Sequence, residues 1–202
     1  MDLKKRTELL SALMEHVLKK HGIENLPHEE VAELRGTLSE ETDRGCALMV
    51  AAYIDYELGK LIKAHIVDDK SVSDDLFSNN GPLGTFSSRI NLAYSLGLIP
   101  NDIRRDLHLL RKIRNEFAHN PKRFGFEKPE IKSRCNEFKF CSPIAEDPRE
   151  RFISAMMGIT GHIHGRLIMT KHLDPMPEID LEKQKKFFEA EMKELFPPQD
   201  KE

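Results

Sequence analysis

The sequence predicts a mainly all-α protein that folds as a helical bundle. Apolar residues recur at three- and four-residue spacing along most of the chain, which is the period of an amphipathic helix. Strand patterns are scarce, and Gly or Pro stands at the ends of several periodic segments. With 202 residues, 39% apolar and 32% charged, the chain is long enough to bury a core and has the composition of a globular protein.

The first 84 residues are predicted to contain three helices and a loop. The apolar spacing predicts a helix over residues 3–20, closed at His21-Gly22, and a second helix after Pro27 that ends near residue 38. Residues 42–66 are apolar around almost the whole helical circumference, so we expect them to form the buried central helix. Residues 68–84 are rich in Asp, Ser, Asn, Gly and Pro, which predicts a loop.

Two helices are predicted after this loop. The first runs from Thr85 or Phe86 to residue 96 and is closed by Gly97. The second spans residues 102–118, and Asn120-Pro121 ends it because the residue before a proline is pushed out of helical geometry.

The remainder of the chain is less regular at first. Residues 122–148 have no clear period, and we expect an irregular insertion or a short hairpin at residues 131–144. A long helix is predicted over residues 149–172, where small residues spaced to permit a close helix crossing are Ser154, Gly158, Gly161 and Gly165. A charged helix over residues 181–195 follows. These elements divide the chain into an N-terminal extension (1–40), a bundle (41–175) and a C-terminal helix and tail (176–202).

Composition and motifs argue against several classes of function. The net charge of −3 gives no overall attraction to nucleic acid or anionic membrane. The N-terminus is too charged for a signal peptide, and the longest apolar run, residues 46–54, is too short to span a membrane. Three cysteines without CxxC spacing predict reduced thiols and a cytoplasmic protein. No nucleotide-binding motif is present, and His162 and His164 fall on different helix faces, so we expect neither cofactor nor metal.

Arg114 has an unusual position in the predicted helix 102–118. On a helical wheel it falls inside the apolar arc formed by Ile103, Leu107, Leu110, Ile113 and Phe117. A guanidinium on a buried face needs a partner or a water-filled cleft, and the natural supporting acids are Asp55 and Glu57 of the central helix. His119 lies about 140° away, at the end of the helix. Two interpretations stay open: a structural salt bridge, or a functional Arg/His pair.

The segment around Arg114 is locally basic. Residues 101–123 contain seven basic and three acidic side chains, a local balance of +4 that includes Arg111 and Lys112. Such a surface can bind phosphate, and it can equally be a solvated helix face. An arginine and a histidine can together cleave RNA without metal, because histidine moves protons near neutral pH and arginine stabilises the phosphorane charge.

Arg114-Asn-x-x-Ala-His119 resembles the R-x4-6-H motif of HEPN domains. This resemblance implies a helical bundle that forms a homodimer and, in many members, a metal-independent ribonuclease. In that case Arg114 would stabilise charge, His119 would be the acid or base, and Asn115 would orient the phosphate or the pair.

The block Gly81-Pro-Leu-Gly-Thr-Phe-Ser-Ser-Arg89 and its continuation to Ile99 resemble the signature of the MltR family, named for the mannitol operon repressor. The similarity covers residues 44–121. It implies a role in transcriptional repression, yet no DNA-reading motif is present, so a protein partner is expected and direct sequence-specific DNA binding is not. Gly81 and Gly84 permit positive φ, so the turn is either a packed structural turn or, with Arg89, an anion site.

Three functional hypotheses follow. The first is an MltR-like regulator on a HEPN-like scaffold that acts through a macromolecular partner. The second is an endoribonuclease that uses Arg114, Asn115 and His119. The third is a non-catalytic interaction module in which Arg114 forms only a salt bridge.

Overall fold

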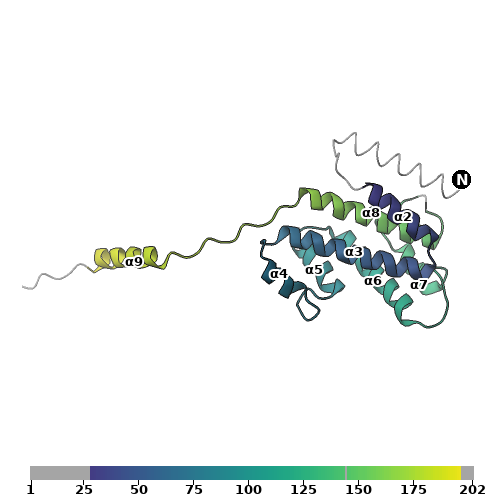
Figure 1. Cartoon of the computed structure of the whole chain (residues 1–202), viewed down its shortest axis with the longest axis horizontal. Coiled ribbons are helices and arrows are strands. Elements are labelled where there is room, and N and C mark those ends of the chain that lie inside the picture. The colour runs from purple at the N-terminus through teal and green to yellow at the C-terminus, as the bar shows by residue number, and fades with distance from the viewer. Residues whose placement is uncertain (1–27, 144, 197–202) are drawn as a thin grey trace, which may run out of the picture.

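The computed structural model describes residues 28–143 and 145–196 of the chain. This part is an all-α bundle, and none of its residues is in a β-strand (Figure 1). Its helices are α2 (His28–Glu40), α3 (Asp43–His65), α4 (Lys70–Phe77), α5 (Phe86–Ser95), α6 (Asn101–His119), α7 (Pro129–Asn136), α8 (Pro148–Met169) and α9 (Leu181–Leu195). The predicted fold class is confirmed. The predicted helix over residues 3–20 lies outside the described residues.

Helix α3 is the centre of the bundle. It packs against α2, α5, α6 and α8, and buried residues occur around most of its circumference, as the sequence predicts (Figure 1). Helix α6 contributes a strongly amphipathic face that includes Leu107, Leu110 and Phe117. Helix α8 covers another side of α3 and also packs on α2 and α7. Three helices, α3, α5 and α6, therefore meet on one side of the bundle.

Polar side chains fix where several helices begin. Thr42, Asp69, Thr85, Asp147 and Asp180 each accept a hydrogen bond from the backbone N–H three residues later, at distances of 2.8–3.1 Å. These bonds satisfy amide groups that a helix leaves without internal partners. Helix α5 ends at Ser95, and the predicted stop, Gly97, follows with a left-handed φ of 68°. The amides of Gly97 and Leu98 close this end on the carbonyls of Tyr94 and Ala93.

Two predictions about the loops are wrong. Residues 68–84 were expected to be a loop but contain α4, which Asp69 caps. The expected hairpin at residues 131–144 is replaced by α7, which begins at Pro129 and buries Ile131 and Cys135 one turn apart. Both helices are eight residues long and lie in polar stretches, where the apolar period that reveals a longer helix is weak.

The chain after α7 is held by a buried carboxylate. Asp106 of α6 is fully buried and accepts hydrogen bonds from the amides of Lys139 and Phe140, at 2.9 and 2.8 Å. Burial raises the pKa of Asp106, and the two backbone hydrogen bonds oppose this shift. The Asp106 carboxylate thus accepts the backbone hydrogen bonds that a neighbouring strand would accept in a hairpin.

Two small residues of α8, Ser154 and Gly158, leave space for the segment that contains residues 140–142. A Cβ at Gly158 would lie 2.7 Å from the Phe140 ring, and Ser154 Oγ accepts a hydrogen bond from the amide of Ser142 at 2.8 Å. The expected helix crossing is therefore wrong at these two positions, because the segment that follows α7 lies there.

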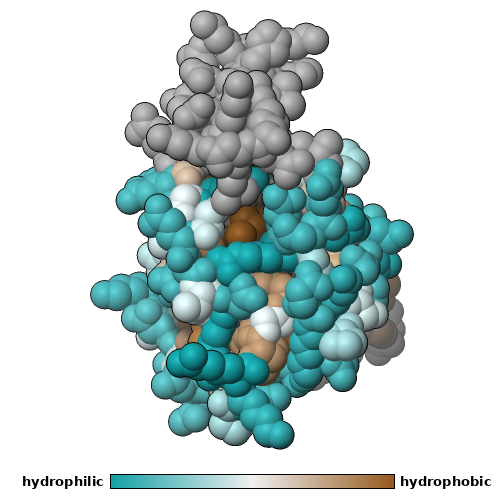
Figure 2. Space-filling model, turned by 90° about the vertical axis from the view of Figure 1, so that its right-hand side faces the viewer, coloured by the Kyte–Doolittle hydropathy of each residue, from teal (hydrophilic) through white to brown (hydrophobic). Residues whose placement is uncertain are grey.

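Two outer parts of the molecule differ in character. The end of the bundle that carries the start of α3 and the end of α6 is mainly hydrophilic (Figure 2). At the opposite end the chain leaves α8 and continues to α9, which lies apart from the bundle and has no buried residue (Figure 1). Within the described residues, no helix has the length and apolar character that crossing a membrane requires.

Candidate functional site

The candidate site is a hollow of about 600 Å³ where α3, α5 and α6 meet. Its walls come from three parts of the chain that are distant in sequence. Helix α3 contributes Leu48, Ala51, Ala52, Asp55 and Tyr56, the start of α5 contributes Gly84, Thr85, Phe86, Ser87 and Arg89, and α6 contributes Arg111, Arg114 and Asn115. The hollow therefore contains Arg89 of the GPLG block and Arg114 and Asn115 of the HEPN-like motif, which the sequence predicts separately.

The Gly-Pro-Leu-Gly turn is a packed structural element. Neither Gly81 nor Gly84 has a positive φ, so that expectation is wrong. Both positions require glycine because other backbone segments lie too close for a side chain. A Cβ at Gly81 would lie 2.3 Å from the carbonyl oxygen of Asp75, and a Cβ at Gly84 would lie 2.6 Å from the carbonyl oxygen of Ser78. The amides of Gly81, Leu83 and Gly84 donate to backbone carbonyls. They are not available to an anion, and the turn serves to place α5 beside α3.

Arg89 connects three elements at one side of the hollow. Its guanidinium donates to Asp55 of α3 at 2.8 Å, and its Nε donates to the carbonyl of Leu83 in the turn at 2.8 Å. Burial raises the pKa of Asp55, while Arg89 and then Arg114 oppose this shift. Asp55 is therefore the partner of Arg89, and its predicted ion pair with Arg114 is absent.

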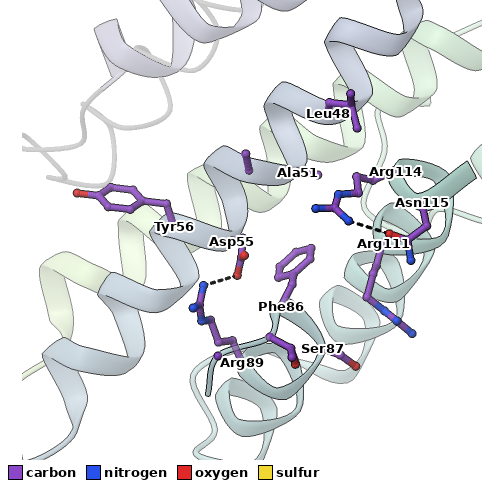
Figure 3. A pocket seen from close by; sticks show the side chains of 13 residues that line it. Leu48, Ala51, Asp55, Tyr56, Phe86, Ser87, Arg89, Arg111, Arg114 and Asn115 are labelled. Carbon is purple, nitrogen blue, oxygen red and sulfur yellow. Dashed lines mark hydrogen bonds and ion pairs between the residues drawn. The ribbon is translucent and has the colours of Figure 1, made fainter. Parts of the chain in front are cut away.

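Arg114 is exposed and lines the open hollow, which is the water-filled cleft that the sequence allows as the alternative to a partner. Its guanidinium extends from α6 toward α3 and Ala51, and it donates to the side chain of Asn115 at 2.9 Å (Figure 3). Of the residues that the structure describes, none forms an ion pair with Arg114. The helical wheel places Arg114 correctly on the inner side of α6, but small alanines of α3 stand opposite, so the space stays open to solvent.

The ring of Phe86 lies between the Arg89–Asp55 pair and Arg114, and the Arg111 side chain extends away from Asp55 (Figure 3). Arg111 also forms no ion pair with a described residue. Three arginines and one carboxylate thus surround the hollow, and the N-terminus of α5, with its partial positive charge, opens into it. The hollow is suited to an anionic group.

The basic side chains of α6 affect a histidine of the same helix. Burial lowers the pKa of His108, and Arg111, Arg104 and Lys112 lower it further.

Lys112 is exposed and lies outside the arginine-lined hollow. Within the described chain, no group of three or more His, Cys, Asp or Glu side chains is placed to hold a metal ion.

His119 lies at a second, more open hollow of about 520 Å³, lined by Lys112, Asn115, Glu116, His119, Asn120, Pro121 and Arg134. Helix α6 continues through His119, so this side chain does not turn back toward Arg114. The structure of one chain does not bring Arg114 and His119 into a shared hollow. Asn115 is the residue common to both.

Glu57 does not belong to the hollow, although it was expected to support Arg114. Its side chain is buried on the side of α3 that faces α8, where it lies 3.2 Å from Nε2 of His164 and 3.0 Å from Lys60 Nζ. The hydroxyl of Tyr53 also lies 3.2 Å from His164 Nε2. A polar cluster of Tyr53, Glu57, Lys60 and His164 therefore lies at the α3–α8 contact, and sequence analysis did not identify it.

The protonation of this cluster follows from its geometry. Glu57 can only accept, so His164 carries its proton on Nε2, and its buried Nδ1 has no hydrogen-bond partner. Burial lowers the pKa of His164 more than the nearby Glu57 carboxylate raises it. Burial and Glu57 also raise the pKa of Tyr53 to about 12. We conclude that His164 is neutral at pH 7.

The three cysteines are free thiols, as predicted. Burial raises the pKa of Cys46 and of Cys135 to about 12, so neither is a reactive thiolate.

Fold and site together define a class of protein: an all-α bundle that presents an arginine-lined hollow where three helices meet. The family model described as MtlR, mannitol repressor, matches residues 39–154, which is more than half of the chain and includes both hollows. The chain belongs to this mannitol repressor family, and the resemblance predicted from the GPLG block is confirmed.

Individual relatives are more distant. The mannitol operon repressors of Escherichia coli K12 and of Escherichia coli O6:H1 strain CFT073 are each 36% identical over 67 residues, which is 32% of this chain and 34% of the relative. The match thus spans about a third of the length of these curated relatives. The X-ray structure of the MtlR–HPr complex from Escherichia coli contains a chain with a TM-score of 0.51 and 19% identity, covering 68% of this chain and 96% of that one. This similarity supports the fold.

Proposed function

We propose that this protein is a regulator that acts by binding a protein partner, with the arginine-lined hollow as the contact site for an acidic group of the partner. One observation carries the proposal: Arg114 reaches over an open hollow and forms no ion pair with a described residue, although Asp55 stands in the same wall. An arginine with unused donors beside an apolar ring such as Phe86 is typical of the anchor residues in protein interfaces.

The family assignment agrees with a regulatory role, and the similar solved structure is a complex with HPr. A protein of the HPr type is therefore the first partner to test. Regulation through a partner also fits the absence, in the sequence, of a motif that reads DNA bases.

The test is a calorimetric titration of the full-length protein with HPr from the same organism. Arg114→Ala should weaken binding at least about tenfold, because truncating an interface anchor costs more than about 1.4 kcal/mol. Arg104→Ala is the matched control, since it removes the same charge from α6 outside the hollow. Equal affinities of wild type and Arg114→Ala would reject the hollow as the contact site, and no binding by wild type would reject an HPr-type partner.

A second candidate, a metal-independent endoribonuclease on a HEPN-like scaffold, has one supporting observation. Asn115 accepts a hydrogen bond from Arg114 and also lines the hollow of His119, so the three motif residues follow one exposed edge of α6. This function predicts cleavage of mixed RNA in EDTA by wild type and none by His119→Ala. Intact RNA with both proteins would reject it for these substrates.

A further inference from the structure

Helix α9 is an amphipathic helix without a partner in the described structure. Its apolar stripe consists of Leu181, Phe188, Met192 and Leu195, which fall within about 60° of one another at 100° per residue. All four are exposed, and Phe188 and Leu195 are 68% and 70% exposed. A helix of 15 residues is marginal in water by itself, so α9 requires a surface on which to bury this stripe.

The charges of α9 are divided along its length. Its first half carries Lys183, Lys185 and Lys186 against one glutamate, and its second half carries Glu189, Glu191 and Glu194 against one lysine. This order is the reverse of what an isolated helix favours, because the N-terminus of a helix is partially positive and the C-terminus partially negative. The division of charge therefore costs stability unless a partner compensates it.

We propose that α9 pairs with α9 of a second copy of this chain in antiparallel orientation. The antiparallel arrangement places the basic half of each helix beside the acidic half of the other, which compensates both the side-chain charges and the helix dipoles. A parallel pair would place the three lysines of one copy beside the same three of the other.

The apolar residues fit the same arrangement. Leu181 and Leu195 each lie seven residues from Phe188, so an antiparallel pair centred on Phe188 sets Leu181 of one helix beside Leu195 of the other at both ends. Phe188 then contacts its own copy at the centre. Gln184 and Met192, each four residues from Phe188, lie opposite each other.

The connection to the bundle permits this pairing. His172 and Leu173 are the last anchored residues, bonded to the carbonyls of Ile66 and His65 at the end of α3. The seven residues 174–180 then reach up to about 25 Å when extended. The pair buries only four stripe residues from each copy, less than the roughly 1,600 Å² of a standard interface requires. We therefore expect a weak dimer that dissociates on dilution.

The first test is sedimentation velocity of the full chain over a range of concentrations. Wild type should shift from monomer to dimer with rising concentration, Phe188→Glu should stay monomeric, and Ala190→Gln, on the opposite face of α9, should behave as wild type. Changing Lys183, Lys185 and Lys186 to Glu should abolish self-association, and so should changing Glu189, Glu191 and Glu194 to Lys. An equimolar mixture of these two charge variants should form a heterodimer, which a misfolded variant would not.

The second test determines orientation by oxidative cross-linking. A mixture of Gln184→Cys and Met192→Cys chains should give mainly the mixed disulfide, whereas wild type, with its native cysteines, should give none. Disulfides between identical variants alone would overturn the antiparallel arrangement. A wild type that stays monomeric at all concentrations, or charge variants that do not associate when mixed, would overturn pairing with a second copy and indicate that α9 folds back on its own bundle.

Discussion

Asp55 and Glu57 stand two residues apart on α3 but lie in opposite surroundings. Asp55 borders the open, arginine-lined hollow and pairs with the partly exposed Arg89. Glu57 is buried against α8 and pairs with His164 and Lys60. Opposite sides of a single turn of α3 thus serve a solvent-facing site and a closed polar cluster. The same chemical group should therefore have very different energetic importance at the two positions.

The largest expected effect is that of Glu57→Ala. This change leaves the buried His164 without its acceptor, and we expect a loss of about 3 kcal/mol in the free energy of unfolding, since breaking a buried pair is strongly destabilising. Lys60 is half exposed and can be hydrated, which limits the loss. Urea unfolding followed by circular dichroism measures it. Asp55→Ala is the matched control, with an expected loss of about 1 kcal/mol; equal losses would contradict the comparison.

The buried cluster should also make stability depend on pH. Burial lowers the pKa of His164, so between its ordinary value of about 6.5 and the lowered value the unfolded chain binds a proton that the folded chain does not. The free energy of unfolding therefore falls as pH drops below about 6.5, by up to about 1.4 kcal/mol per pH unit from this group.

His164→Gln should remove this contribution, so the stability difference between wild type and variant should shrink from pH 7 to pH 5.5. Taking the difference cancels the titration of all other groups. His119→Gln makes the same substitution at an exposed histidine outside the cluster and serves as the control. A constant difference between wild type and His164→Gln would show that His164 does not titrate in this way.

At the hollow, the Arg89–Asp55 pair should couple more weakly. Both side chains are partly exposed, at 17% and 29%, so a double-mutant cycle with Arg89→Ala and Asp55→Ala should give a coupling of about 1 kcal/mol or less that decreases with salt. The corresponding cycle of Glu57→Ala and His164→Ala should give a larger coupling with little salt dependence. A stronger coupling at the hollow would reverse the order proposed for the two sides of α3.

The long helices could be predicted from sequence because their signals are local. The apolar period and the stops at Gly97 and Asn120-Pro121 locate α3, α5, α6 and α8 to within a few residues. Helices α4 and α7 were missed because each has eight residues and depends on a cap or on two buried side chains. The anchoring of residues 139 and 140 by Asp106 is a contact over more than thirty positions, and no local pattern encodes it.

The candidate site was predictable only in part. The motifs identified Arg89, Arg114 and Asn115, and the structure places them around one hollow. Their partners were not predictable, because the choice between Asp55 and Glu57 depends on which side of α3 meets α5 and which meets α8. One sequence signal for Glu57 exists: it lies beside Leu58 and one turn from Ile54 and Leu61, inside the most apolar helix of the chain. A charge in that position indicates a buried polar partner, and His164 is that partner.

The smallest expected effect on stability is that of Arg114→Ala. Its guanidinium is exposed and bonds only to the neighbouring Asn115, so the free energy of unfolding should change by less than about 0.5 kcal/mol. A loss of several kcal/mol would instead support the salt-bridge interpretation, in which Arg114 is structural. With stability preserved, a loss of partner binding in Arg114→Ala is a direct effect at the hollow. The residue with the least structural importance in this comparison is therefore the one whose substitution reports most clearly on function.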